Sequence, residues 1–312
     1  MTVLERVLRE AARSGVTRAV VTGDAAQLPQ LPRLPIHVEV ASPDAPPPVQ
    51  AQSLAGDQIA GVQIVDEATR REASRALLQT CRRPYDGVGD RYVIRSFSLR
   101  LTGVLARLGA TPNQVTCANV AVGLTACVLA HYGTRSSLLL AGICMFLQVV
   151  LDSSDGELAR IRFMSSKFGM WLDNVSDDII DNLFIAMLGV GLGGTWAPVA
   201  IAAAIGRGLC AVMIYWDRAR AGKSGDVMSF AWWFDKPDED LAFRYETAAP
   251  KPSLLSIVRG LGRRDLYVLV WAASCISGLP VVGAGLGIVL GVVYFALAVA
   301  HMIATRGVQR AR

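Results

Sequence analysis

The sequence predicts an all-α polytopic membrane protein with six transmembrane helices, preceded by a small cytoplasmic α/β domain or the remnant of one. The first observation is composition: 52% of the 312 residues are hydrophobic and the mean hydropathy is +0.38, which is high for a soluble domain. The second is segregation, because the apolar residues gather in stretches of about 20, the length that crosses a bilayer. The third is that acidic and basic residues lie at the ends of these stretches.

Six stretches are candidate spans, and they start near Val115, Ser137, Met170, Thr195, Leu266 and Val281. The second and third are short by hydropathy alone, because aspartates lie at their ends. Basic residues concentrate in "ELARIRFMSSKFG", in the stretch 217–264 and in the tail "TRGVQRAR", whereas "GLGGT" and "SGLPVVGAG" carry no charge. We therefore expect a protein that is integral to the cell membrane. By the positive-inside rule, both termini and the acidic segment should face the cytoplasm.

Residues 1–82 have a different character. "TRAVVTG" and "PIHVEVA" predict short strands, and "DEATRREASRALLQTC" predicts a helix. No phosphate-binding Gly-rich loop follows the first strand, so we expect a structural or docking appendage. Residues 83–110 predict a linker and an amphipathic helix at the membrane surface, and residues 111–312 predict the six-helix domain.

Charge and cysteine content exclude other classes. The net charge of +5 is spread over short basic clusters, which in a membrane protein reflect topology, and no stacking motif or zinc finger accompanies them, so we expect no nucleic-acid partner. The six cysteines form no CxxC pair and have no histidine at metal-ligand spacing, which favours buried, unpaired thiols.

The most informative stretch is "LDSSDGELARIRFMSSKFGMWLDNVSDDIIDN", residues 151–182. Asp152 and Asp155 are three residues apart and Asp173 and Asp177 four apart, so each pair lies on one face of a helix. If the two helices face each other, four carboxylates converge. Ionised carboxylates are costly in a membrane protein, and two Mg²⁺ or Mn²⁺ ions, which prefer oxygen ligands, would offset that cost.

Small and basic residues lie between the two acidic pairs. Gly156, Ala159 and Gly169 leave room for a ligand beside the helix backbone. Arg160 offers a fork of donors suited to phosphate. Carboxylates, small residues and an arginine together predict a site for a diphosphate; a solvent-exposed acidic face would not require glycines at these positions.

These residues carry a resemblance to a known family. The segment fits D-x2-D-G-x2-A-R-x8-G-x3-D-x3-D with every spacing intact, and it resembles the CDP-alcohol phosphotransferases (CDP-alcohol phosphatidyltransferases). The matching residues are Asp152, Asp155, Gly156, Ala159, Arg160, Gly169, Asp173 and Asp177. The resemblance extends through "TPNQVT" and the six-span layout, from about Arg83 to the C-terminus.

The resemblance implies a membrane enzyme, usually a homodimer, that binds two Mg²⁺ or Mn²⁺ ions. It transfers a substituted phosphate from a CDP-alcohol, by default CDP-diacylglycerol, to the hydroxyl of an acceptor alcohol and releases CMP, as in phospholipid biosynthesis. By position, the metal ligands are Asp152, Asp155, Asp173 and Asp177, and Asp177 is also the general base. The expected contacts to CDP are Thr111, Pro112, Asn113, Gln114, Gly156, Ala159, Arg160, Ser166 and Gly169.

The acceptor leaves more alternatives open. Arg207, Arg263 and Arg264 are candidates for holding an anionic acceptor such as inositol phosphate or another polyol phosphate, although Arg263 and Arg264 also suit anchors at the membrane surface. The residue after the last motif aspartate is often basic in the family, and here it is Asp178, followed by Asp181. These two either face solvent, pair with arginines of the long loop, or alter acceptor recognition.

Other readings remain. The run from Cys81 to Thr116 resembles the branch of the family in which a nucleotidyltransferase-like domain precedes the membrane part, so a soluble donor such as CDP-inositol is an alternative. A cation- or proton-coupled transporter also places acids in membrane helices, and a scaffold without activity shares the fold. Replacing Asp177 by Asn separates the three classes, because an enzyme loses CMP release, a transporter loses flux and a scaffold loses neither.

Overall fold

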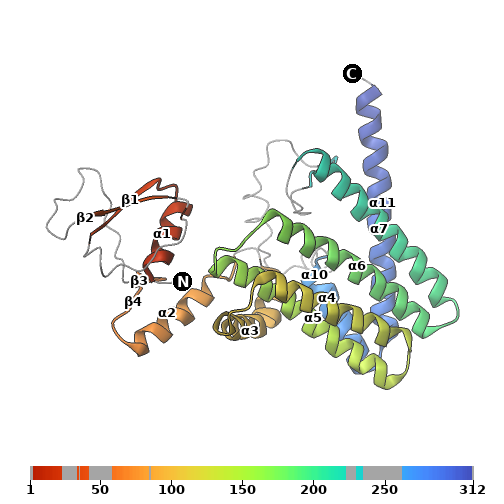
Figure 1. Cartoon of the computed structure of the whole chain (residues 1–312). Helices are drawn as coiled ribbons and strands as arrows, with labels where there is room; N and C mark the ends of the chain where they lie inside the picture. The colour runs from red at the N-terminus through yellow and green to blue at the C-terminus, as the bar shows by residue number, and fades with distance from the viewer. Residues whose placement is uncertain are drawn as a thin grey trace. The chain divides into compact units, whose positions relative to one another are not determined.

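Figure 1 shows the protein as a computed structural model, in which residues 3–22, 34, 36–41, 58–83, 86–222, 230–234 and 262–310 are described. Most of the predicted long basic loop, residues 223–229 and 235–261, lies outside these ranges, as do the side chains of the basic tail. The chain divides into two compact units. One comprises residues 1–81 with 161–163, and the other comprises residues 82–160 and 164–312.

The first unit contains short elements of both kinds. They are α1 (Val3–Arg13), β1 (Arg18–Thr22), β2 (His37–Ala41), β3 (Gln58–Ile59), β4 (Val62–Gln63) and α2 (Glu67–Gln79). Strands β1 and β2 pair in parallel, and β3 and β4 form a separate antiparallel pair. The two predicted strands correspond to β1 and β2, which form one sheet, and the predicted helix corresponds to α2. Asp66 caps α2 by accepting a hydrogen bond from the Thr69 amide at 2.8 Å, which satisfies an amide of the first turn.

The second unit is helical. It comprises the π-helical turn η1 (Asp90–Ile94), α3 (Arg95–Leu108), α4 (Pro112–His131), α5 (Arg135–Ile161), α6 (Lys167–Leu192), α7 (Trp196–Arg220), α10 (Arg264–Ser277) and α11 (Pro280–Arg310). A helix therefore occurs at each of the six stretches predicted to span a membrane. Helices α4, α5 and α7, and α11 over 280–305, are long and apolar enough to cross one.

The other two predicted spans differ in length or charge. Helix α6 has 26 residues but carries four aspartates. Helix α10 has 14 residues, which is about 21 Å at 1.5 Å per residue and shorter than the roughly 30 Å of a hydrocarbon core. Among the described residues, four spans rather than six meet the criteria of length and composition.

Packing inside the second unit fixes the direction of α6. This helix packs against α4 and α7, and α11 packs against α7 and α10. Gly123 of α4 allows a close approach of α6, since a Cβ there would lie 2.7 Å from Ile180 Cδ1. Below the acidic residues, Phe184 packs on Trp271 of α10 with ring centroids 5.7 Å apart. The apolar part of α6 is thus buried, and its acidic part is held at one end of the bundle.

A buried ion pair attaches α3 to the motif end of α5. Glu157 is fully buried and accepts hydrogen bonds from Arg95 Nη1 at 2.5 Å, Ser98 Oγ at 2.7 Å and Thr102 Oγ1 at 2.6 Å. These three donors follow each other at helical spacing and therefore share one face of α3. Asp86 holds the other edge of Arg95 at 2.8 and 2.9 Å. Burial raises the pKa of Asp86, but the hydrogen bonds from Arg95 and the Arg83 amide, together with the charges of these arginines, outweigh burial and lower the pKa.

Replacing Glu157 by Ala should lower the free energy of unfolding by about 3–5 kcal/mol, because it leaves a buried guanidinium without one partner. Denaturant titration of the purified protein in detergent, followed by circular dichroism, measures the change. Asp217→Ala is the matched control, since Asp217 is exposed and a surface change of this kind stays within about 0.5 kcal/mol. Equal losses for the two variants would contradict a structural role for the Arg95–Glu157 pair.

Candidate functional site

Three aspartates from two helices meet at the end of the bundle. Asp152 of α5 and Asp173 and Asp177 of α6 each offer a carboxylate oxygen, and these oxygens lie within 4.8 Å of one another. The four-residue spacing on α6 places its two members on the same face. Among the described residues, Asp173 Oδ1 is buried with no hydrogen-bond partner. An oxygen-only group with an unsatisfied acceptor fits a hard divalent cation such as Mg²⁺ or Mn²⁺.

The fourth predicted ligand, Asp155, lies one turn further along α5. It is 4% exposed, and its Oδ2 accepts a hydrogen bond from Thr116 Oγ1 of α4 at 2.6 Å. The structure therefore brings three of the predicted ligands together. The fourth, Asp155, lies on α5 like Asp152, and a hydrogen bond joins it to α4. Thr116 belongs to the "TPNQVT" run, which connects that run to the acidic motif.

Asp177 is held by two amides. Its Oδ1 accepts from Asn119 Nδ2 at 3.3 Å and from Gln148 Nε2 at 3.2 Å, and both amide residues are fully buried. The sequence analysis did not single out either of them. The available signal was an uncharged polar residue inside an otherwise apolar predicted span, since such residues are expensive in lipid and usually have a partner.

Arg264 enters the acidic cluster directly. Its Nη1 lies 2.8 Å from both Asp152 Oδ2 and Asp177 Oδ2, and its Nε lies 3.3 Å from Asp181 Oδ2. Arg264 is the first residue of α10, and its side chain lies in the same site as the motif carboxylates. Of the two roles expected for it, the contacts favour the site over an anchor at the membrane surface.

Arg207 of α7 forms a second charged group beside the first. Its Nη2 lies 3.3 Å from Asp178 Oδ1 and 3.1 Å from Asp181 Oδ2 and donates to Tyr267 Oη at 2.7 Å. Tyr267 in turn donates to Asp181 Oδ2 at 2.7 Å, and Tyr215 donates to Asp178 Oδ2 at 2.6 Å. The charge of Arg207 is thus neutralised inside the protein.

The alternative in which Asp181 faces solvent is wrong, and Asp178 is only partly exposed. Asp181 has no exposed side-chain surface and Asp178 has 25%. Two carboxylates buried in this way need cationic partners, and Arg207 supplies one to both. Arg264, at the end of the long loop, supplies a second to Asp181.

Arg263 points elsewhere. Its Nε lies 3.1 Å from Asp265 Oδ1, and Asp265 Oδ2 accepts from the backbone amides of Gly89 and Asp90 at 3.0 and 3.2 Å. Gly87 permits this approach, because a Cβ there would lie 2.1 Å from Asp265 Oδ2. The start of α10, which carries Arg264, is therefore fixed to the segment before α3.

The residues expected to contact CDP lie at helix ends around the cluster. Thr111 and Gln114 form a capping box at the start of α4 with Pro112 in its first turn, and Ser166 caps α6 by accepting from the Gly169 amide at 2.9 Å. A Cβ at Gly169 would lie 3.5 Å from Asn113 Oδ1, so the two helix starts are neighbours. On α5, a Cβ at Gly156 would lie 3.4 Å from Arg160 Nη1, while Ala159 is partly buried.

Comparison with known proteins agrees with this site. Residues 109–239 match the family model described as CDP-alcohol phosphatidyltransferase. This range includes every residue of the acidic motif. Residues 109–239 therefore resemble the CDP-alcohol phosphatidyltransferases. The predicted resemblance to this family is confirmed for these residues, and the family is one of transferases.

Curated relatives are similar to this chain over less than half of its length. An archaetidylinositol phosphate synthase of Pyrococcus horikoshii is 36% identical over 129 residues, which are 40% of this chain and 63% of that protein. A bifunctional IPC transferase and DIPP synthase of Thermococcus kodakarensis is 33% identical over 151 residues, 47% of this chain and 34% of that protein. A protein of the same name from Aquifex aeolicus is 28% identical over 142 residues, 45% of this chain and 32% of that protein. The match spans about a third of the length of the two bifunctional proteins.

Asp90 provides a pH-dependent test of how α10 is attached to the segment before α3. Burial and the nearby charge of Asp265 raise the pKa of Asp90 from 3.8 to about 7. A carboxyl with a raised pKa favours the folded state when protonated, so its contribution to stability falls as pH rises from about 4 to about 7. Asp90→Asn should therefore raise the melting temperature by an amount that grows over this range and is constant above it. Thermal melts of both proteins at several pH values, with chelator present, measure this difference, and a constant difference would contradict it.

Proposed function

We propose that this chain transfers a substituted phosphate from a CDP-alcohol to the hydroxyl of an acceptor alcohol and releases CMP. The observation that carries the proposal is the convergence of Asp152, Asp173 and Asp177 within 4.8 Å inside a segment that matches the family model. A transporter would explain buried acids but not the small residues and the arginine interleaved with them at the family's spacing.

The donor atoms of the cluster fit two divalent cations, Mg²⁺ or Mn²⁺, as the family resemblance implies. Asp152, Asp173 and Asp177 would hold them, with Asp155 as the fourth ligand. Bound there, the cations would neutralise charge on the diphosphate of the donor and on the leaving CMP. Asn119 and Gln148 orient Asp177 toward this position through hydrogen bonds to its Oδ1.

The residues of the chain then divide the remaining work. Arg160 and the amides and side chains at the starts of α4 and α6, including Thr111, Asn113 and Ser166, would bind and orient CDP. Gly156, Ala159 and Gly169 would leave room for it. Asp177 would accept the proton of the acceptor hydroxyl as its oxygen attacks the phosphorus attached to the donor alcohol. One P–O bond forms to the acceptor and the P–O bond to CMP breaks, so a phosphodiester and CMP result.

For the whole chain we propose six spans with both termini and the site on the cytoplasmic side of the cell membrane, in a homodimer. The asymmetry of basic residues between the loops supports this orientation. In this arrangement α6 and the short α10 cross within the bundle, shielded from lipid by their neighbours, since their acidic and polar side chains have partners inside the protein. We further propose that residues 1–82 are an appendage, 83–110 a juxtamembrane linker and 111–312 the membrane domain.

The names of the relatives point to the substrates. The archaetidylinositol phosphate synthase supports a lipid CDP-alcohol donor, by default CDP-diacylglycerol, with an inositol phosphate acceptor. The name of the bifunctional relatives supports a second candidate, in which the donor is a soluble CDP-alcohol such as CDP-inositol. For either donor, Arg264 is the arginine best placed for an acceptor phosphate, because it lies beside Asp177 and its side chain is 23% exposed, whereas Arg207 is 7% exposed and enclosed by Asp178 and Asp181. In this proposal the cations would replace Arg264 as the partner of Asp152 and Asp177.

Acceptor-dependent release of CMP tests the reaction. Purified protein in detergent with Mg²⁺ or Mn²⁺ should release CMP from CDP-diacylglycerol or CDP-inositol when offered an acceptor from a panel of inositol, inositol phosphate, glycerol phosphate and serine. Asp177→Asn should lower the rate at least about 100-fold, since it removes the proton acceptor, while Asp217→Asn, an exposed change on α7, should not. CMP release that survives Asp177→Asn, or no release with either donor, would overturn the proposed function.

Arg264 and Arg263 form a matched pair for the acceptor. Arg264→Gln should raise KM for a phosphate-bearing acceptor by about 10-fold or more, the effect of losing one charge-assisted hydrogen bond. Arg263→Gln should change it little, because Arg263 pairs with Asp265 outside the cluster. Steady-state CMP release at varied acceptor concentration provides the comparison, and similar KM values for the two variants would contradict the assignment of Arg264.

A further inference from the structure

An aromatic segment follows α7 in the chain and lies against two helices that are long enough to cross a membrane. Its described part is 230–234, "FAWWF". Phe230 is 4% exposed and packs in a small cluster with Cys210 and Ile214 of α7 and Ala298 of α11. His301 of α11 lies beside the same ring, with centroids 5.1 Å apart. The segment is therefore attached to the seam between α7 and α11.

The outer part of the segment presents aromatic rings to the surroundings. The rings of Trp232 and Phe234 are parallel, with centroids 6.2 Å apart, and Trp233 packs edge-on against Phe234 at 4.8 Å. Trp233 is 40% exposed and Phe234 is 59% exposed. Two large aromatic side chains exposed side by side on a loop are unfavourable in water and typical of a contact surface.

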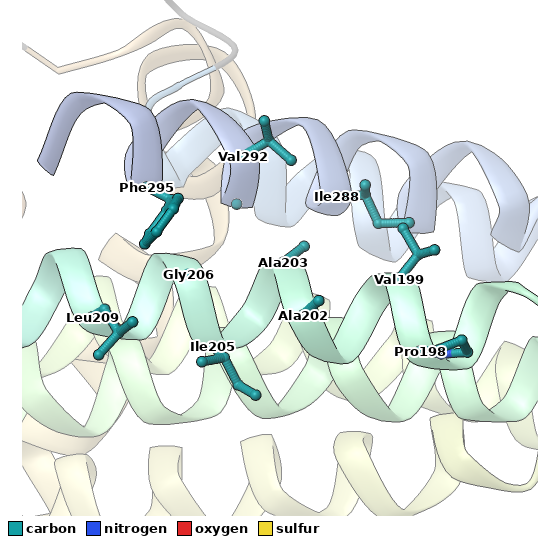
Figure 2. A pocket seen from close by; sticks show the side chains of 11 residues that line it. Pro198, Val199, Ala202, Ala203, Ile205, Gly206, Leu209, Ile288, Val292 and Phe295 are labelled. Atoms are coloured by element: carbon teal, nitrogen blue, oxygen red, sulfur yellow. The ribbon is translucent and has the colours of Figure 1, made fainter. Parts of the chain in front are cut away.

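An apolar groove runs along the seam on which the segment lies. Figure 2 shows a groove between α7 and α11, of about 650 Å³, whose lining side chains are all apolar, among them Val199, Ile205, Leu209, Val292 and Phe295. Several of these are about half exposed, as expected of side chains that meet acyl chains. The aromatic segment begins where this groove ends, because its first contact on α7 is Cys210.

The outer face of α7 changes character at the same level. Exposed apolar residues continue to Val212, then Trp216 is exposed, and Arg220 lies with its guanidinium 4.7 Å from the centre of the Trp216 ring. Apolar residues, then an aromatic residue, then a basic residue is the order in which a bilayer passes from hydrocarbon through the interface to water. Ile214, which packs against the aromatic segment, lies next to this transition.

We propose that residues 230–234 are an interfacial membrane anchor, with Trp233 and Phe234 embedded among the lipid headgroups and the upper acyl chains. The partner is the bilayer itself. The anchor rests on α7 and α11 through Phe230 and presents its outer rings to lipid at the level of Trp216. Its position follows from the spanning helices and does not depend on the reaction proposed above.

Tryptophan quenching by brominated lipids tests the anchor in the full-length protein. The chain has six tryptophans, and a variant with the other five replaced by Phe retains Trp233. A companion variant retains Trp271, which is 1% exposed in the interior. Both are placed in phosphatidylcholine–phosphatidylglycerol vesicles whose acyl chains carry bromine near the headgroup or near the chain end. The single change Trp233→Phe in the otherwise unaltered chain gives the same information by difference if the five-fold variants do not fold.

The anchor predicts that Trp233 emission is lost more strongly with bromine near the headgroup than with bromine near the chain end, and that aqueous iodide has little effect. Trp271 should be quenched weakly by all three. Quenching of Trp233 by iodide alone would place the segment in water, and protection from every quencher would place it under protein, such as a second copy. Stronger quenching by the deep bromines would place it in the hydrocarbon core. Each of these three results would overturn the proposal.

Discussion

The structure of the membrane unit depends on how carboxylates are neutralised at one end of an apolar helix bundle. Six aspartates lie between residues 152 and 181, and isolated ionised carboxylates in such a place cost several kcal/mol each. Arg207 forms ion pairs with Asp178 and Asp181. Arg264 forms ion pairs with Asp152 and Asp177. Asp155 accepts a hydrogen bond from the hydroxyl of Thr116. Asp173 has a buried carboxylate oxygen without a partner among the described residues. Asp152, Asp173 and Asp177 thus have one arginine, Arg264, for three carboxylates, and this excess of negative charge is suited to cations.

The two aspartates that pair with Arg207 position helices around the site. Asp178 and Asp181 lie on the same helix as the motif aspartates but serve to hold Arg207 and, through Tyr267, the face of α10 that follows Arg264. The elements around them are fixed by further buried charges: Glu157 holds α3 through Arg95, and Asp265 holds the turn before α3 through the amides of Gly89 and Asp90. The segment formed by η1 and α3 is thus attached to α5 and to α10, the helices that carry Asp152 and Arg264.

The sequence was most informative where spacing alone decides geometry. The intervals in the acidic motif predict which carboxylates share a helix face, and Asp152, Asp173 and Asp177 meet as that pattern indicates. The sequence was less informative where a partner lies far away in the chain. Glu157 and Arg95 are 62 residues apart, and Asn119 and Asp177 are 58 apart, so no local pattern pairs them. Hydropathy also could not decide whether α6 and α10 cross a membrane, because α6 carries four aspartates and α10 has 14 residues.

We propose that Asp152, Asp173 and Asp177 hold divalent cations. The most direct measurement is Mn²⁺ binding to the purified protein, followed by electron paramagnetic resonance of the free ion, for the unaltered chain, for Asp173→Asn and for the exposed control Asp217→Asn. The account predicts saturable binding to the unaltered chain and to the control and a large loss of affinity in Asp173→Asn. Equal binding by all three proteins, or none by the unaltered chain, would contradict it.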